Sequence, residues 1–366
     1  MKPREFHIWQ FPEDKIRVLF RNNKEFVDNA IKSFGTIKSL GDFLEIHPNI
    51  ISSWKKYPLY IPLLYVKKIV DKLNLNWAEI EKDIVSYKGI NTSAPIFNPK
   101  LPIKETPKIF SLITHIICDG SVNKNGIPSY INSNKSLIDN IDQTLKKSFG
   151  NINNKLYFGK GDNKNCYEYR FSKIVIDLLE HFYKIRLYKA NRLPKEIFDL
   201  PKEFSIAVIK AFADDEGNVD LNRRIGIYST NKKILETLIK LLREKLGFTN
   251  ISDTKEKGEN YYYFYIKSND ILKYERKIGF IHQSKKEKLR YIIESRKGKG
   301  MHGKVGETKE KLLNLLKDNV LSTYDIMKQI NINKSNINMQ IKRLEDEGLI
   351  VQNNKIGQTV FWTRRK

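Results

Sequence analysis

Two stretches of the sequence decide the fold: "LITHIICDG" at residues 112–120 and "IKAFADDEG" at residues 209–217. Each is an apolar run that ends in an acidic residue followed by glycine. A single such ending indicates only that a helix stops there. Here the two acids, Asp119 and Glu216, lie 97 residues apart (216 − 119), and so do the glycines that follow them, Gly120 and Gly217. This shared offset raises the question whether the two stretches are the two halves of one active site.

The same offset recurs further along the chain. Asn134 in "NSNKS" and Asn231 in "STNKK" each open an amphipathic helix, and those helices close at "FG" (149–150) and "LG" (246–247). An ordered series of matches with one offset indicates an internal duplication. We therefore divide the central block into two repeats, residues 103–198 and 199–294.

Each repeat shows the pattern helix, two strands, helix, two strands, helix. The opening helix of the first repeat, "KIFSLITHIIC", is apolar nearly all round, which predicts burial on several sides. The predicted strands are "GIPSYINS", "NKLYFGK" and "CYEYRFS" in the first repeat, and "RRIGIYST", "GFTNISDT" and "NYYYFYIKS" in the second. They alternate aromatic with polar residues, so one sheet face is free to contact a partner. The prediction is an α+β fold with a pseudo-twofold core of two αββαββα repeats.

A pseudo-twofold core that packs two buried helices side by side brings their C-terminal ends together. Asp119 and Glu216 then lie at the negative ends of two helix dipoles, which is unfavourable unless a cation is present. Carboxylate oxygens suit Mg²⁺, which binds one or two carboxylates together with water and substrate phosphates. This arrangement predicts phosphodiester hydrolysis.

The overall composition favours a polyanionic partner. Lys and Arg outnumber Asp and Glu by 66 to 42, a formal charge of +24. Such an excess favours nucleic acid, because phosphate contacts release counterions. The two cysteines, Cys118 and Cys166, lack the spacing of a zinc site. No stretch has the length of a membrane span or the pattern of a signal peptide, so we expect a cytoplasmic protein.

Residues 1–90 are predicted to be helical and to precede a proline-bearing connector at 91–102. Within them, "TIKSLGDFLEIHPNIISSWKK" (36–56) indicates helix, tight turn, helix, with the second helix starting at Pro48. This pattern resembles the helix-turn-helix of repressor-like domains, whose second helix enters the major groove. The candidate DNA contacts are Asn49, Ser52, Ser53 and Lys55. A small helical interaction module is the alternative.

Residues 307–366 follow a Gly- and Lys-rich linker (295–306) and form a compact C-terminal block. Ser322-x-x-Asp325 is a capping pattern, and a helix with Ile337, Ile341 and Leu344 on one face precedes two short strands around a polar turn. This block resembles a winged helix-turn-helix. Its candidate groove contacts are Lys334, Ser335, Asn338 and Lys342, with phosphate contacts from Arg364, Arg365 and Lys366.

With its two motifs, their spacing and the "STNKK" and "IGFIHQSKKEKL" elements, the block 103–294 resembles the LAGLIDADG homing endonucleases that carry two motifs per chain. The resemblance implies that the eighth motif position holds the metal, here Asp119 and Glu216. It also implies two four-stranded saddles on the DNA major groove and cleavage of both strands. A basic residue near the end of each half assists in that family, and the repeat register selects Arg192 and Lys285.

The motifs depart from the family at three positions. Motif one has Thr114 where glycine usually makes the close helix contact, and Ile117 where aspartate is common; motif two has Ala211 at the contact and keeps an acid, Asp214. A threonine is expected to hold the helices slightly apart. We interpret His115, inside the apolar helix, as a core histidine with a hydrogen-bond partner rather than a metal ligand.

These observations predict a site-specific, Mg²⁺-dependent endonuclease of double-stranded DNA. A monomer suffices, because one chain carries both acids. A free-standing protein is expected, since inteins resemble one another in starting with Cys or Ser and ending in Asn after His, whereas this chain starts with Met and ends "TRRK". Two alternatives are open. One is a domesticated LAGLIDADG-core transcriptional regulator that binds DNA without cutting it, and the other is an intron maturase that binds RNA.

Overall fold

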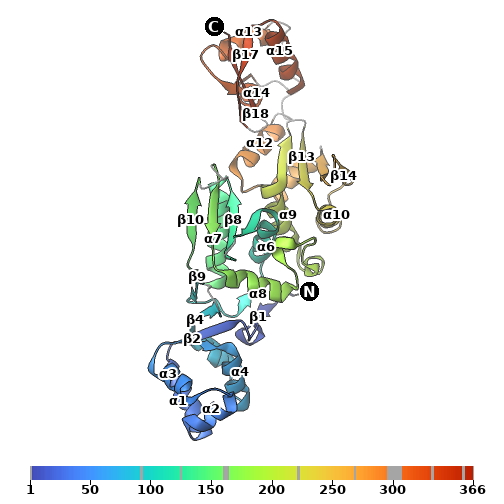
Figure 1. The fold of residues 1–366 in the computed structure, drawn as a ribbon. Helices are drawn as coiled ribbons and strands as arrows, with labels where there is room; N and C mark the ends of the chain where they lie inside the picture. Colours follow the sequence, from blue (N-terminus) through green and yellow to red (C-terminus); the bar gives the residue numbers. More distant parts are fainter. Residues whose placement is uncertain are drawn as a thin grey trace.

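The computed structural model describes residues 2–90, 94–123, 126–159, 165–220, 223–267, 269–294, 307–330, 334–356 and 359–365. The chain is elongated, with the N-terminal block at one end, the core in the middle and the C-terminal block at the other end (Figure 1). Helices and antiparallel sheets are combined throughout. The predicted α+β class is confirmed. The predicted linker at 295–306 lies outside the described residues.

The core contains two halves with the same succession of elements. The first half comprises α6 (Pro107–Asp119), β7 (Gly120–Val122), β8 (Pro128–Asn132), α7 (Lys135–Phe149), β10 (Lys155–Phe158), β11 (Tyr167–Arg170) and α8 (Lys173–Tyr183). The second comprises α9 (Lys202–Glu216), β12 (Gly217–Asp220), β13 (Arg224–Ser229), α10 (Lys232–Lys240), β14 (Lys255–Glu256), β15 (Tyr262–Lys267) and α11 (Asn269–Lys277). A further helix, α12 (Gln283–Glu294), follows in the second half.

The two halves also share sheet topology and helix caps. Their four-stranded antiparallel sheets have the orders β10-β11-β8-β7 and β14-β15-β13-β12. The repeated asparagines are N-caps: the Asn134 side chain accepts from Ser136 N (3.0 Å), and that of Asn231 accepts from Ile234 N (3.3 Å). Each cap satisfies a backbone donor that the first helical turn leaves free. The offset found in the sequence therefore corresponds to repeated local structure.

One predicted strand is displaced. In "GFTNISDT" (247–254), Ile251 makes a single bridge to Ile266, and the strand β14 lies at 255–256. The reason is a side chain: the Asp270 carboxylate accepts the backbone N–H groups of Thr249 (2.7 Å) and Asn250 (2.6 Å). These donors are therefore not available to a sheet.

The prediction of an all-α N-terminal block is wrong in one respect. Its five helices are α1 (Asn23–Phe34), α2 (Ile37–Leu44), α3 (Pro48–Lys56), α4 (Leu63–Lys72) and α5 (Trp77–Asp83). They accompany a sheet of order β3-β2-β4-β5-β9, made of Ile61–Pro62, Ile16–Phe20, Ile84–Gly89, Ile96–Phe97 and Asn151–Ile152. The strand β2 alternates buried and half-buried residues, and its partner β4 lies more than sixty residues away, so local periodicity did not reveal the pair.

The N-terminal block and the core form one body. Strand β5 arises from the predicted connector, and β9 belongs to the first half of the core, so one sheet crosses the boundary. A second crossing pairs β1 (Glu5–Phe6) with β6 (Ile103–Lys104), and Arg4 Nη2 lies 2.8 Å from Glu105 Oε1. One hydrophobic cluster runs from Phe6 to Ile292. This fusion fixes the N-terminal helices relative to the core.

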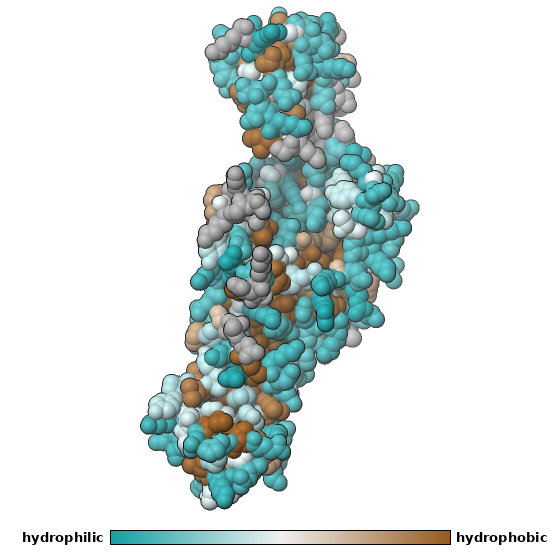
Figure 2. Space-filling model, viewed as in Figure 1, coloured by the Kyte–Doolittle hydropathy of each residue, from teal (hydrophilic) through white to brown (hydrophobic). Residues whose placement is uncertain are grey.

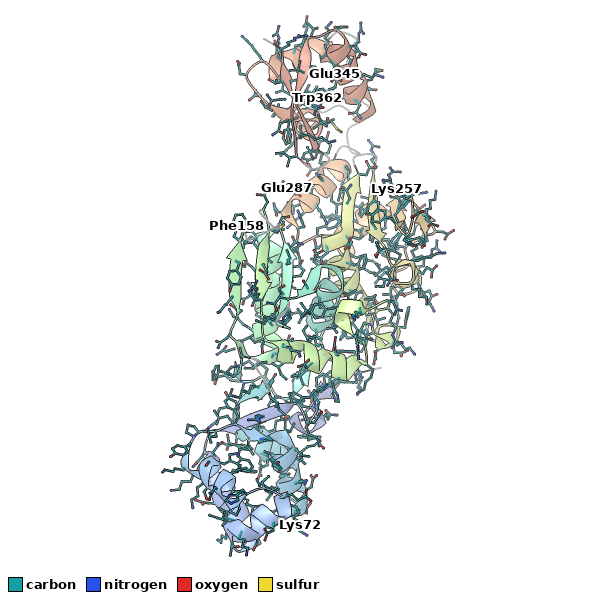
Figure 3. The ribbon with its side chains drawn as sticks, in the orientation of Figure 1. Lys72, Phe158, Lys257, Glu287, Glu345 and Trp362 are labelled. Carbon is teal, nitrogen blue, oxygen red and sulfur yellow. The ribbon has the colours of Figure 1, made fainter. Side chains whose placement is uncertain are left out.

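The C-terminal block has a hydrophobic core of its own. It comprises α13 (Glu307–Leu315), β16 (Leu321–Ser322), α14 (Thr323–Ile330), α15 (Lys334–Asp346), β17 (Ile350–Ile356) and β18 (Thr359–Arg364), with sheet order β16-β18-β17. Tyr291 on α12 contacts it, donating to Met327 O at 3.1 Å. Figure 3 labels Trp362 on β18 and Glu345 on α15. The succession of helices and hairpin is that of a winged helix-turn-helix.

The surface is mostly hydrophilic on the face in Figure 2, with hydrophobic patches along the middle of the core and on the N-terminal block. Within the described ranges, no helix combines the length and the apolar character that crossing a membrane requires.

Candidate functional site

The two motif helices, α6 and α9, pack against each other at the centre of the molecule (Figure 1). Their predicted contact residues, Thr114 and Ala211, are fully buried. The Thr114 hydroxyl donates to Phe110 O of its own helix at 2.8 Å, so the polar group is satisfied without a partner on α9. A threonine at this position is thereby compatible with a buried helix–helix contact.

Each motif helix runs directly into a strand through its glycine. Gly120 and Gly217 have extended backbone conformations, with φ of −75° and −88°. A Cβ at Gly120 would collide with the carbonyl oxygen of Ile116, and one at Gly217 with that of Ala213. Close approach to the preceding turn, and not a left-handed conformation, therefore requires glycine here. The acids occupy the last helical position in both halves.

The two acids share one electrostatic environment. Burial and the charge of Asp215 raise the pKa of Asp119 to about 7, against a hydrogen bond from Asn132 that lowers it; Glu216 raises it further. The pKa of Glu216 is likewise raised by burial and by Asp215, while Lys285 lowers it. Because Asp215 and Glu216 of α9 both raise the pKa of Asp119 of α6, the two helix ends share one electrostatic environment.

Lys285, predicted as a basic residue of the site, lies on α12 and contacts the end of α9. Its Nζ donates to three successive carbonyl oxygens, of Ala213 (3.1 Å), Asp214 (2.5 Å) and Asp215 (3.2 Å). An ammonium group has three N–H donors, so these contacts use them all. Lys285 therefore places its charge at the negative end of the α9 dipole, immediately before Glu216.

Asp214 completes a reciprocal clamp between α9 and α12. Its buried carboxylate accepts from the backbone N–H groups of Ile281 (2.9 Å) and His282 (2.9 Å), just before α12 begins. A side chain of α9 thus accepts from two backbone N–H groups before α12, and a side chain of α12, Lys285, donates to three backbone carbonyls of α9. The corresponding residue of motif one is Ile117, which cannot accept hydrogen bonds.

Arg192, the predicted counterpart of Lys285, lies elsewhere. It is exposed, and its Nη2 donates to Lys184 O at 3.5 Å. The chain around it lies between two short 3₁₀ segments, Leu187–Lys189 and Lys195–Phe198, where the second half has α12. The structure therefore brings together Asp119, Glu216 and Lys285, and places Arg192 at the surface.

Three further residues at the site, Asp215, Tyr130 and Asn132, were not predicted from the sequence. Asp215 lies between the two named acids of motif two, and its buried side chain accepts from His115 Nδ1 (2.8 Å) and from the Tyr130 hydroxyl (2.6 Å). Asn132 donates to Asp119 Oδ2 at 2.8 Å. The run of three acids, 214–216, was a signal for Asp215; the contacts with His115 and Tyr130 cross the two halves and had no local signal.

The donor set fits a divalent cation of the Mg²⁺ type. Within the part of the chain that the structure describes, no three His, Cys, Asp or Glu side chains are arranged to hold a metal ion. Asp119 and Glu216 instead provide a carboxylate pair, and burial together with the charge of Asp215 raises the pKa of each carboxyl. A pair suits Mg²⁺, which retains several water ligands.

The open faces of the two sheets each carry an arginine beside a tyrosine ring. In the second sheet, Phe264 and Ile266 of β15 are buried, whereas Tyr263 and Tyr265 face the other side, where the Arg224 guanidinium lies 4.1 Å from the Tyr265 ring. In the first sheet, the Arg170 guanidinium lies 4.6 Å from the Tyr157 ring. Phe158, 60% exposed, lies at the end of β10 (Figure 3). Both faces offer cations and aromatic rings to a partner.

The N-terminal candidates lie on α3, which follows α2 after a tight turn. Gly41 of α2 is buried, and a Cβ there would approach Ile46 O of the turn to 2.9 Å, so the turn packs closely against α2. Asn49 and Ser52 are exposed on α3. Ser53 donates to Asn49 O at 2.8 Å, and Lys55 Nζ lies 2.6 Å from Asp28 Oδ1 of α1. The Ser52 hydroxyl likewise donates to Pro48 O at 3.2 Å, so both serine hydroxyls bond to their own helix, and Asn49 is the candidate of this set that is exposed without such a bond among the described residues.

The C-terminal candidates lie on α15. Asn338 and Lys342 are exposed, while Ile337, Ile341 and Leu344 are buried, as expected for an outward and an inward face. Lys334 and Ser335 are the first residues of α15, but their side chains lie outside the described set. Arg364 and Arg365 are exposed, and Lys366 is not among the described residues.

Comparison with known proteins gives one family match and several partial likenesses. Residues 306–351 match the family model "Bacterial regulatory protein, arsR family". Two curated relatives come from Methanocaldococcus jannaschii: the DNA-directed RNA polymerase subunit Rpo1C is 26% identical over 43% of this chain, and the probable translation initiation factor IF-2 is 28% identical over 60%. The chain spans about a fifth of the length of these relatives, 19% of each.

Among solved structures, I-DmoI in complex with DNA and Mn is 23% identical, with a TM-score of 0.35, and the match covers 47% of this chain and 96% of that one. Full-length DUF199/WhiA from Thermatoga maritima is 17% identical, with a TM-score of 0.37, over 66% and 90%. The homing endonuclease I-WcaI, bound to its DNA recognition sequence, is 16% identical, with a TM-score of 0.33, over 50% and 85%. Likenesses with identities and TM-scores this low do not indicate what this chain does.

Proposed function

We propose that this chain is a site-specific endonuclease of double-stranded DNA that requires a divalent cation, Mg²⁺, held by Asp119 and Glu216. The observation that carries the proposal is the convergence of one acid from each half at the paired ends of α6 and α9, with the pKa of both carboxyls raised by burial and by neighbouring negative charge. When bound, the ion supplies Lewis-acid polarisation of the phosphodiester and a more acidic water. One chain provides both acids, so a monomer suffices.

The residues around the acids hold this site in place. Lys285 neutralises the carbonyl end of α9 beside Glu216, and Asn132 orients Asp119 by donating to its Oδ2. The cations and tyrosines on the open sheet faces are suited to phosphates and base edges. We assign exposed Arg192 to phosphate contact. Asn49, Ser52, Asn338 and Lys342 lie on helices of the kind that enter the major groove.

A transcriptional regulator is the second candidate. It is favoured by the match of residues 306–351 to the arsR-type regulatory family and by the helix-turn-helix arrangement of α2 and α3. In that case the core would bind DNA without cutting it. The endonuclease requires the carboxylates of Asp119 and Glu216 for metal-dependent cleavage, whereas the regulator does not require them for binding DNA.

Selection from a randomised duplex library separates the two candidates. The full chain is incubated with the library in Mg²⁺ or in EDTA, beside Asp119→Asn, Glu216→Gln and the control Asp142→Asn, which alters a partly exposed carboxylate on α7. Metal-dependent cuts that are lost in the first two variants and kept in the control support the nuclease. A selected binding site that no protein cuts, and that all variants bind equally, supports the regulator. Preferential binding of a structured RNA would contradict both.

A further inference from the structure

A chain of hydrogen bonds crosses from the second half of the core to the motif-one acid. Asp215, on α9, accepts from the Tyr130 hydroxyl at 2.6 Å. The Tyr130 hydroxyl also lies 3.2 Å from Asn132 Nδ2, and the same amide nitrogen lies 2.8 Å from Asp119 Oδ2. Both Tyr130 and Asn132 lie on β8, so one strand connects the ends of α6 and α9.

The direction of every bond in this chain is determined. The Asp215 carboxylate can only accept, so the Tyr130 hydroxyl donates to it and accepts from Asn132. The Asn132 amide cannot be flipped, because its Oδ1 accepts from Asn134 N at 2.9 Å, at the N-cap of α7. Its two N–H groups are therefore directed at Tyr130 and Asp119. His115, donating from Nδ1 at 2.8 Å, fixes the other oxygen of Asp215.

Burial makes this arrangement specific. Tyr130 and His115 are fully buried, and the Asp215 side chain has no exposed surface. Hydrogen bonds of low-dielectric sites are strong, and a donor or acceptor left without its partner is costly. Rotation of any member would leave at least one such group unsatisfied. The Asp119 carboxylate is thus oriented by a network that is anchored in the opposite half.

We propose that Tyr130 and Asn132 are positioning residues, which transmit the orientation set by Asp215 of the second half to the Asp119 carboxylate of the first half. This inference rests on the proposed function, because it takes Asp119 as a ligand of the divalent cation. In this proposal Tyr130 and Asn132 act through Asp119 and are not themselves ligands of the ion. Their removal weakens ion binding while leaving the DNA-contacting faces unchanged.

The molecule contains a matched control network. Tyr169 lies directly opposite Tyr130 in the β8–β11 pair, is also buried, and donates its hydroxyl to Asp142 Oδ1 at 2.7 Å. Asn154 Nδ2 donates to the same oxygen at 2.8 Å. This second Tyr–Asn–Asp set ends at Asp142 on α7 and does not include a motif acid. Removing its hydroxyl tests the effect of losing a buried tyrosine hydrogen bond alone.

The experiment compares the full-length Tyr130→Phe and Tyr169→Phe chains with the unaltered chain. Mn²⁺ affinity is measured by electron paramagnetic resonance, without reference to cleavage, and the Mg²⁺ dependence of single-turnover cleavage is measured on a selected site. Loss of a residue that orients a metal ligand lowers metal affinity or activity roughly 10–100-fold. We expect such a loss in Tyr130→Phe, with target affinity in EDTA unchanged, and unaltered Mn²⁺ binding in Tyr169→Phe.

Each outcome decides the proposal. If both variants bind Mn²⁺ like the unaltered chain, the positioning role is overturned, whether or not the chain cleaves DNA. If the chain binds Mn²⁺ but never cleaves, the proposed function fails, and the shift in Tyr130→Phe still tests the network. If the unaltered chain binds no Mn²⁺, both fail. Should Tyr130→Phe not fold, Asn132→Ala, with Asn154→Ala as its control, makes the same comparison at a less buried residue.

Discussion

At the end of α9, three successive acids have different surroundings, whereas the end of α6 has one acid between Cys118 and Gly120. Asp214 holds the start of α12, Asp215 joins His115 and Tyr130, and Glu216 faces the shared site. In the first half, Ile117 and Cys118 occupy the first two positions. The backbones of the halves are alike, but the supporting contacts differ: Asn132 of the first half donates to Asp119, and Lys285 of the second half donates to the carbonyls before Glu216. A duplicated fold can therefore hold an asymmetric site.

The largest effect on stability is expected when Asp214 of the second half is replaced by isoleucine, the residue at the equivalent position of the first half. In Asp214→Ile, the backbone N–H groups of Ile281 and His282 lose a charged acceptor, so we expect about 3 kcal/mol less stability. Urea denaturation, with hydrogen exchange at these two amides, measures the loss. The control Ile117→Val should cost about 1 kcal/mol. Slow exchange at both amides in Asp214→Ile would show that α12 is held by other contacts.

Where the halves are equivalent, substitutions should have equal effects. A Cβ at Gly120 or Gly217 meets the carbonyl of the preceding turn, so Gly120→Ala and Gly217→Ala should each destabilise the chain by about 2 kcal/mol. Thermal and urea unfolding of the two variants check this symmetry. If one is tolerated and the other is not, the two helix-to-strand junctions differ in solution.

The two basic candidates should separate clearly. Lys285→Met leaves three carbonyls at the end of α9 without a cation, at a cost of about 1.5 kcal/mol. Arg192→Met alters an exposed side chain and should change stability by less than about 0.5 kcal/mol. Urea denaturation measures the stability of both variants. Equal losses of stability would show that Arg192 and Lys285 are equivalent, as the repeat register predicted.

The shared charge of the two acids should appear in the pH dependence of stability. Folding raises the pKa of Asp119 from 3.8 to about 7, so its protonated form favours the folded state. That contribution is full below pH 3.8 and is lost as the pH rises to about 7. In metal-free buffer, the stability of the unaltered chain relative to Asp119→Asn should therefore fall over this interval.

A pH series of urea denaturation curves measures this difference. If it stays flat between acid and neutral pH, the Asp119 carboxyl titrates like an exposed one, and the negative environment inferred for the site is absent. Added Mg²⁺ should restore the lost stability at neutral pH, because the ion binds the ionised carboxylates of the folded state.

Much of the fold could be predicted because its signals are local. The caps at Asn134 and Asn231, the glycines after the motif acids and the alternating strands each depend on a few neighbouring residues. The N-terminal sheet was missed because β2 pairs with a distant strand, and β9 is added from the core. Those pairings depend on tertiary contacts that no short stretch reveals.

The candidate site divides in the same way. Asp119 and Glu216 could be named because each ends its own motif, and Lys285 because the family resemblance implies a basic residue near the end of each half. The offset between Arg192 and Lys285 is 93 residues (285 − 192), four short of the 97 that relates the motifs, and the structure shows different chain paths at these two places. The contacts among Asp215, His115 and Tyr130 arise only when the halves meet.

Strand-resolved cleavage of a selected duplex by Asp119→Asn and Glu216→Gln tests most directly whether the two halves form one site. The two strands carry different labels, and each cut is followed separately in Mg²⁺. If the acids share one site, either substitution abolishes both cuts, and we expect this result. A variant that still cuts one strand at the normal rate would show that each half works alone, and an unaltered chain that binds the duplex without cutting it would contradict the nuclease itself.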